Sequence, residues 1–177
     1  MKLRKTGSVL FSLLLTLLFS VSVAVPAFAA GGYQSDSKDM LNAINKYRTT
    51  PALCQQMNLN GQVDQLYRKP LKWDKDMASI ARIRAKQVST YYSHYLANGK
   101  TYWDVTSNGK EVYTELICRD QETAAEAAAY WYNKESYTYG AQGNRRDMLD
   151  DRITCMGAAH YQNDEGRDYW VVSFGQY

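Results

Sequence analysis

The sequence predicts an α+β fold built on a small antiparallel sheet. Two segments, 37–48 and 75–92, place apolar residues along one face of a helix. Three short runs after residue 110 are rich in β-branched and aromatic residues, which is typical of strands. An alanine-rich segment separates the first run from the other two. The predicted order is therefore helix, helix, strand, helix, strand, strand.

Each of the first two helices has an apolar stripe and a candidate N-terminal cap. Asp36 or Ser37 could cap the first helix and Asp74 the second, because short polar side chains accept hydrogen bonds from N–H groups of the first turn. The first stripe consists of Met40, Leu41, Ile44 and Tyr47. The second stripe consists of Met77, Ala81, Ala85, Val88 and Tyr92. One of the two histidines in the chain, His94, follows the second helix.

Residues 49–70 form a long connection, within which 62–68 could make a short helix. The alanine-rich helix spans 119–133, and Asp120 is its expected cap. A short helical turn covers 144–151.

The predicted strands cover 111–118, 154–161 and 167–175. The last two are separated by the turn-forming sequence QNDEG, so they should form an antiparallel hairpin.

Residues 1–29 have the pattern of a secretory signal peptide. Basic residues precede an apolar run over 8–25, and Ala27-Phe28-Ala29 supplies a small-x-small cleavage pattern. An uncleaved membrane anchor is the alternative, but the cleavage pattern favours removal. We therefore expect a polar lead-in at 30–37 and one domain over 38–177, in a secreted, extracellular protein with no membrane anchor after cleavage.

Cleavage would also change the charge of the protein. The full chain has 21 basic and 18 acidic side chains, and removal of Lys2, Arg4 and Lys5 leaves 18 of each. A formally neutral chain gives no electrostatic reason to expect a nucleic acid or an anionic membrane as partner. The 15 tyrosines and four tryptophans favour a core and rim of amphipathic aromatic residues, and a tyrosine-rich surface could bind carbohydrate or peptide.

Four stretches stand out by their order and spacing: LNAINKYR, PLKWDKDMASIARIRAKQ, SHYLANG and the C-terminal series AAAYWYNKESYTYG, RRDMLDDRITCMGAAHY and YWVVSFG. Together they resemble the CAP superfamily, also called the SCP domain. This superfamily groups cysteine-rich secretory proteins, antigen 5 and plant pathogenesis-related proteins with bacterial relatives. The resemblance implies a bacterial-type secreted member. It also implies an α-β-α sandwich with a three-stranded antiparallel sheet between helical layers.

The cleft of this superfamily often carries two histidines and two glutamates that can hold a divalent metal. The resemblance assigns His94 to the first histidine and Glu115 to the strand glutamate, although Thr114 and Leu116 replace the usual neighbours of that glutamate. Of the other two ligand positions, Lys134 holds one and Asn144 the other. Because two of four ligands are missing, and a lysine in the cleft would pair with Glu115 instead, we expect no metal and no cofactor.

Three interpretations of His94 remain. It could be a working metal ligand, a polar cleft residue hydrogen-bonded to Glu115 or to tyrosine hydroxyls, or a plain surface residue, and the second is favoured. The other histidine, His160, should be a half-exposed residue on a strand. The expected rim aromatics of the cleft are Tyr91, Tyr92, Tyr95, Tyr130 and Tyr132.

The three cysteines are Cys54, Cys118 and Cys155, and secretion makes a disulfide plausible. The family fold places the strands of Cys118 and Cys155 in one sheet, so the resemblance favours a bridge between them, with Cys54 left in the long connection.

Three functions follow from these observations. The favoured hypothesis is a secreted, non-catalytic CAP domain whose degenerate cleft binds a small amphipathic ligand, a glycan or a protein. The second is a hydrolase acting on peptide or cell-wall material through His94 and Glu115, against which the replaced tetrad argues. The third is an extracellular structural or adhesion module.

Overall fold

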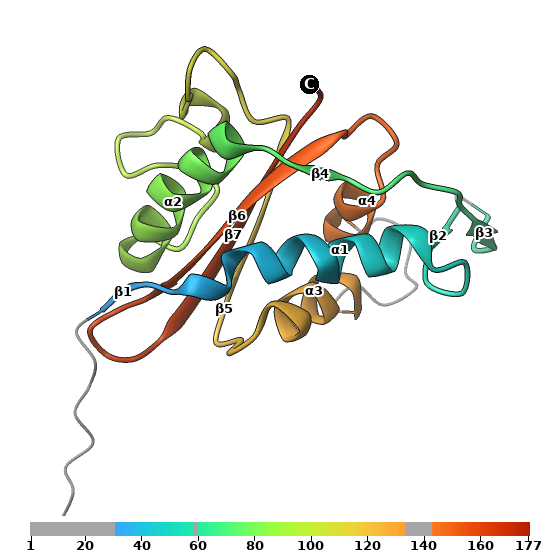
Figure 1. Ribbon diagram of the computed structural model, residues 1–177, viewed down its shortest axis with the longest axis horizontal. Helices are drawn as coiled ribbons and strands as arrows, with labels where there is room; N and C mark the ends of the chain where they lie inside the picture. Colours follow the sequence, from blue (N-terminus) through green and yellow to red (C-terminus); the bar gives the residue numbers. More distant parts are fainter. Residues whose placement is uncertain (1–30, 59, 134–142) are drawn as a thin grey trace, which may run out of the picture.

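The computed structural model describes residues 31–58, 60–133 and 143–177, and it confirms the predicted α+β fold (Figure 1). The predicted signal peptide lies outside these residues. The helices are η1 (Ser35–Lys38), α1 (Asp39–Thr49), α2 (Lys75–Thr90), η2 (Tyr102–Asp104), α3 (Ala124–Asn133) and α4 (Gly143–Met148), where η denotes a 3₁₀ helix. The strands are β1 (Gly32–Tyr33), β2 (Gln55–Met57), β3 (Val63–Gln65), β4 (Lys72–Trp73), β5 (Thr114–Arg119), β6 (Cys155–Gln162) and β7 (Asp168–Gly175). No helix in the described ranges is long and apolar enough to cross a membrane.

The central sheet contains the three predicted strands, with β7 antiparallel to both β6 and β5. The short strands β1 and β4 pair with the other edge of β6. The expected helix at 62–68 does not form, because β2 and β3 make a separate hairpin there. Asn58 Oδ1 closes the turn of this hairpin by accepting hydrogen bonds from two backbone N–H groups, and Gly61 adopts a positive φ of 77°.

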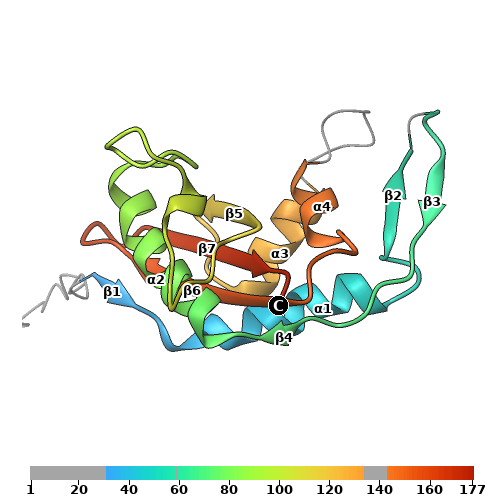
Figure 2. The same cartoon turned by 90° about the horizontal axis from the view of Figure 1, so that it is seen from above.

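Helices cover both faces of the sheet, as Figures 1 and 2 show: α2 lies on one side, and α1, α3 and α4 lie on the other. Alternation along β7 divides its side chains between two cores. Trp170, Val172 and Phe174 pack toward α1 and α3, whereas Val171 packs toward α2. Glu115 on β5 pairs with Ser173, which lies on the same face of β7 as Val171. The side chain of Glu115 therefore points to the α2 face of the sheet.

Helix α2 approaches β6 very closely at Gly157. A Cβ atom at this position would overlap the backbone of Met77 and Ala78. Only glycine leaves room for this contact, which fixes the height of α2 above the sheet.

The helix caps agree only in part with the sequence predictions. Asp74 caps α2 as expected, since its side chain accepts hydrogen bonds from two N–H groups of the first turn. Neither Asp36 nor Ser37 caps α1, because η1 precedes it directly. The prediction that Asp120 caps α3 is also wrong: it lies in a turn with φ of 66°. Thr123 and Glu126 instead accept hydrogen bonds from each other's backbone N–H groups.

The predicted disulfide between Cys118 and Cys155 is wrong, and all three cysteines are buried thiols. Cys118 lies opposite Trp170 on β7, whereas Cys155 lies opposite Gly175. Five residues of strand separate these positions by about 17 Å, whereas a disulfide requires Cα atoms within about 7 Å. The two side chains also belong to cores on opposite faces of the sheet.

Candidate functional site

A cleft of about 310 Å³ lies where β5 begins, between the loop that follows α2 and helix α4. The loop after α2, helix η2, strand β5 and helix α4 form its walls. The residues that line it are His94, Tyr95, Thr101, Tyr102, Trp103, Thr114, Glu115 and Asp147.

A buried ion pair forms the base of this cleft. Arg84 Nε donates to Glu115 Oε2 at 2.7 Å, and Arg84 Nη2 donates to Glu115 Oε1 at 2.9 Å. Both side chains are completely buried. Two parallel hydrogen bonds between a guanidinium and a carboxylate give a strong, directional pair. Glu115 is therefore neutralised inside the protein before any ligand arrives.

The same guanidinium connects α2 to the loop that carries His94. Arg84 Nη2 also donates to the carbonyl oxygen of Ser93 at 2.8 Å, and Nη1 donates to Gln87 Oε1 at 3.1 Å. Arg84 thus joins helix α2, the following loop and strand β5 at one point.

Glu115 also orients His94. Their closest atoms, His94 Nδ1 and Glu115 Oε1, are 3.1 Å apart. A carboxylate only accepts hydrogen bonds, so this geometry places a proton on Nδ1. In the neutral ring, Nε2 is then the nitrogen that can accept a hydrogen bond. The His94 side chain is 45% exposed, and its ring meets Tyr102 edge to face with centroids 5.8 Å apart.

Helix η2 presents Tyr102 and Trp103 to the cleft. Asp104 Oδ2 accepts hydrogen bonds from both the backbone N–H and the hydroxyl of Thr101, at 2.7 and 3.0 Å. These hydrogen bonds, the backbone one above all, lower the pKa of Asp104. Tyr102 N–H donates to the carbonyl oxygen of His94, and Trp103 packs edge to face on Tyr102 while remaining 51% exposed.

The fold and this cleft define a CAP domain. The chain belongs to the cysteine-rich secretory protein family (CAP), whose sequence profile matches residues 41–174. Comparison with curated protein sequences gave no match.

Two solved structures have the same fold at low sequence identity. An outer surface protein from Borrelia burgdorferi has a TM-score of 0.58 and 16% identity over 81% of this chain and 93% of that one. Venom allergen-like protein 4 from Schistosoma mansoni has a TM-score of 0.59 and 17% identity over 80% of this chain and 88% of that one.

The structure brings two of the four predicted cleft residues together. His94 and Glu115 are in contact, as described above. Asn144 lies on α4, but it is Asp147 from this helix that lines the cleft. Lys134, the expected partner of Glu115, lies outside the described residues. It is Arg84 that contacts both carboxylate oxygens of Glu115.

The expected tyrosine rim is only partly present. Tyr95 lines the cleft, and Tyr91 lines a neighbouring hollow. Tyr92 is exposed but lines neither. The prediction is wrong for Tyr132, which is buried and donates its hydroxyl proton to the carbonyl oxygen of Leu53. Tyr130 packs against the same core, because this part of α3 faces the opposite side of the sheet.

The prediction of a half-exposed His160 is wrong as well. Its side chain is almost fully buried, and its ring stacks on Trp170 with centroids 4.1 Å apart. The ring nitrogens face two carboxylates: Nδ1 lies 3.0 Å from Asp36 and Nε2 lies 2.8 Å from Asp168. His160 therefore attaches the N-terminal segment to the sheet and does not line the cleft.

The donor set of the cleft does not fit the divalent metal that the superfamily often holds. Both oxygens of Glu115 are engaged by Arg84, and Nδ1 of His94 is engaged by Glu115. Across residues 31–58, 60–133 and 143–177, no three His, Cys, Asp or Glu side chains converge in a way that could hold a metal.

Arg84 is the main site residue that the sequence analysis missed. It occupies a position of the buried stripe of α2, four residues after Ile80 and four before Val88. A charged residue within an apolar stripe signals a buried partner. Tyr102, Trp103 and Asp147 were also missed, because they come from two short helices, η2 and α4, without a periodic pattern.

Proposed function

We propose that this CAP domain is a secreted, non-catalytic carbohydrate-binding protein and that its cleft binds a neutral sugar. The cleavage pattern at Ala27-Phe28-Ala29 supports secretion. An intact-mass measurement on protein exported by the producing cell should give a chain that begins at Ala30. A species that retains residues 1–29 would contradict the secretion part of the proposal.

The observation that carries the binding function is the exposure of aromatic rings beside hydrogen-bonding groups in one cleft. Trp103 and Tyr95 are 51% and 59% exposed, although side chains of this size are usually buried. A pyranose ring has an apolar C–H face, which gains free energy by covering such a ring. The imidazole of His94, threonine hydroxyls and the Asp147 carboxylate line the same cleft and suit the hydroxyl groups of a sugar.

The charges of the cleft disfavour an anionic ligand, because the Asp147 carboxylate lines it. Glu115 and Arg84 compensate each other within the protein, so neither offers a net charge to a ligand. A cleft of about 310 Å³ is at the lower end of the range for small-molecule sites and suits one or two sugar rings.

The buried ion pair also supports the absence of catalysis. A general acid or base must reach the substrate, but Glu115 is completely buried and already hydrogen-bonded through both oxygens.

One observation favours hydrolysis as a second candidate. Glu115 orients His94 through Nδ1, which leaves Nε2 to activate a water molecule. Product analysis after prolonged incubation with oligosaccharides tests this candidate. Cleavage by the wild type that is lost in His94→Ala would favour the hydrolase over the binding protein.

Isothermal titration calorimetry tests the binding function. The ligands are trimers of glucose and of N-acetylglucosamine, and the variants are Trp103→Ala and Tyr67→Ala. Tyr67 is the matched control, because it is 80% exposed but lies beyond β3, away from the cleft. We expect saturable binding of at least one trimer that weakens about tenfold or more in Trp103→Ala, the size of one lost aromatic contact. The control should bind like the wild type, and equal losses in both variants would contradict the proposal.

A further inference from the structure

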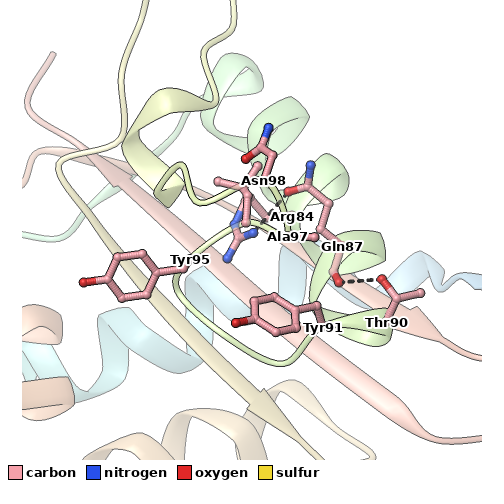
Figure 3. Close-up of a pocket in the computed structure, with 8 residues that line it drawn as sticks. Arg84, Gln87, Thr90, Tyr91, Tyr95, Ala97 and Asn98 are labelled. Carbon is pink, nitrogen blue, oxygen red and sulfur yellow. Dashed lines mark hydrogen bonds between the residues drawn. The ribbon is translucent and has the colours of Figure 1, made fainter.

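A second hollow, of about 210 Å³, lies beside the cleft, between the last turns of α2 and the loop after it (Figure 3). Its lining includes Arg84, Gln87 and Asn98 together with the rings of Tyr91 and Tyr95. Tyr95 lines both the hollow and the cleft, so the two are neighbours on one face of the molecule.

The side-chain amide of Gln87 is held in one orientation. Its Oε1 accepts the hydrogen bond from Arg84 Nη1, and a guanidinium has no other role than donor. The amide nitrogen therefore points away from the guanidinium, as Figure 3 shows. Its two N–H groups have no protein partner within the described part of the chain.

Asn98 is held in the same way from the other side. Its Oδ1 accepts a hydrogen bond from the backbone N–H of Lys100 at 3.1 Å. A backbone N–H can only donate, so the oxygen is fixed there and the Nδ2 donors are left over. These donors, too, have no partner among the residues that the structure describes.

Two oriented NH₂ groups thus line one small hollow, and each is a donor only. A carbonyl oxygen has two lone pairs and can accept from both. Of the described residues, Arg84 is the only charged one that lines the hollow, and Glu115 compensates its charge. The preferred acceptor is therefore neutral, which excludes carboxylate, phosphate and sulfate as the best ligands.

The remaining lining groups are apolar or aromatic. Leu96 and Ala97 can contact a methyl group, and the exposed rings of Tyr91 and Tyr95 can cover a sugar ring. A neutral carbonyl next to a methyl group, carried on a sugar, is an acetyl group, and the amide carbonyl of an acetamido group accepts hydrogen bonds more strongly than an ester carbonyl does.

We propose that this hollow is a subsite for the acetamido group of an N-acetylated amino sugar, within the same glycan that occupies the His94 cleft. The inference rests on the proposed carbohydrate-binding function and specifies its ligand class. It assigns to Gln87 and Asn98 the selection of N-acetylated over plain sugars.

Calorimetry with two matched ligands tests the inference: the β-1,4-linked trimer of N-acetylglucosamine and the corresponding trimer of glucose. They differ at the 2-position, where the first carries the acetamido group. The wild type should bind the N-acetylated trimer about tenfold or more tightly, as expected when a site built for a hydrogen-bonding group meets a ligand without it.

The variants Gln87→Glu and Asn98→Asp keep the accepting oxygen and replace the NH₂ donor by a second, negatively charged acceptor oxygen. Each should lower the affinity for the N-acetylated trimer about tenfold and leave that for the glucose trimer unchanged. Asn42→Asp on the exposed face of α1 makes the same chemical change away from the hollow and should have no effect. Asn98 is exposed on a loop, so its variant keeps the test valid if Gln87→Glu fails to fold.

The outcomes separate the two proposals. Equal affinity for both trimers, or an unchanged preference in Asn98→Asp, overturns the acetamido subsite but leaves carbohydrate binding intact. If neither trimer binds, the proposed function and this inference are both contradicted. Displacement of the N-acetylated trimer by inorganic sulfate, lost in Asn98→Asp, would assign the hollow to an anion and also overturn the inference.

Discussion

Arg84 and Glu115 form a fully buried pair in which two N–H groups of one guanidinium contact both oxygens of one carboxylate. The two residues are 31 positions apart, on α2 and β5. Their pairing fixes His94 through Glu115 and the preceding loop through the carbonyl oxygen of Ser93. The position of the cleft therefore depends on this one ion pair.

Removal of one partner should be costly. Glu115→Ala leaves the Arg84 guanidinium buried and without a counter-charge, and we expect a loss of about 3–5 kcal/mol in the free energy of unfolding. Urea titration followed by circular dichroism measures it. The double variant Arg84→Met/Glu115→Leu removes both charges and should be more stable than Glu115→Ala. A free energy of unfolding for Glu115→Ala within about 1 kcal/mol of the wild-type value would show that the Arg84–Glu115 pair is open to water.

Gly157 should tolerate no side chain. Gly157→Ala places a methyl group into the backbone of Met77 and Ala78, so α2 must move away from β6. We expect a loss of about 3 kcal/mol in the free energy of unfolding, at the upper end for overpacking. Thermal unfolding provides the measurement, and an unchanged melting temperature would mean that α2 lies farther from the sheet.

Asp104 should make ligand binding sensitive to acid. The hydrogen bonds from Thr101 lower the pKa of its carboxylate below that of the unfolded chain. The stabilisation that these hydrogen bonds provide is therefore present above the pKa of Asp104 in the unfolded chain, which is about 4. It is lost as the pH falls through the lower pKa of Asp104 in the folded protein. Because Asp104 holds η2 and hence Trp103, sugar affinity should fall in this acidic range.

The variant Asp104→Ala separates this effect from other titrations. At neutral pH it should bind the sugar more weakly than the wild type, and the two affinities should converge once the pH falls below the lowered pKa of Asp104. A ratio of affinities that stays constant with pH would contradict the role of the carboxylate.

The cysteines should all react as thiols once the protein unfolds. Alkylation in denaturant without reductant, followed by mass spectrometry, should label three cysteines per chain, because Cys54, Cys118 and Cys155 are thiols that form no disulfide. The native protein should react slowly, because all three are buried. Labelling of only one cysteine in denaturant would reveal a disulfide and contradict the structure.

Much of the fold could be predicted from the sequence, because its longer elements carry a periodic pattern. The stripe of α2, the cap at Asp74 and the strand-like composition of β6 and β7 depend on local residues alone. The short strands β1 and β4 have no such pattern, since two residues form a strand only where a neighbour is already in place. Asp120 was misassigned as a cap because two capping residues lie close together in sequence.

The candidate site was harder to predict, since its contacts join residues far apart in the chain. His94 and Glu115 could be named from a family resemblance, but their counter-charge could not. Arg84 occupies a position of the apolar stripe of α2, which indicates a buried partner, but only the folded sheet places Glu115 beside it. The Cys118–Cys155 prediction failed because residues in one sheet need not be close. Both cysteines lie in the central sheet, but they differ in register and point to opposite faces.

Tryptophan fluorescence tests carbohydrate binding in the cleft most directly. Of the four tryptophans, Trp131 and Trp170 are fully buried, whereas Trp103 is half exposed and lines the cleft. On titration with the N-acetylglucosamine trimer, the wild type should show a saturable blue shift as a sugar ring covers the indole of Trp103. Trp103→Phe should retain a stacking ring and lose this signal. No spectral change at any concentration, or the same change in Trp103→Phe, would contradict the account.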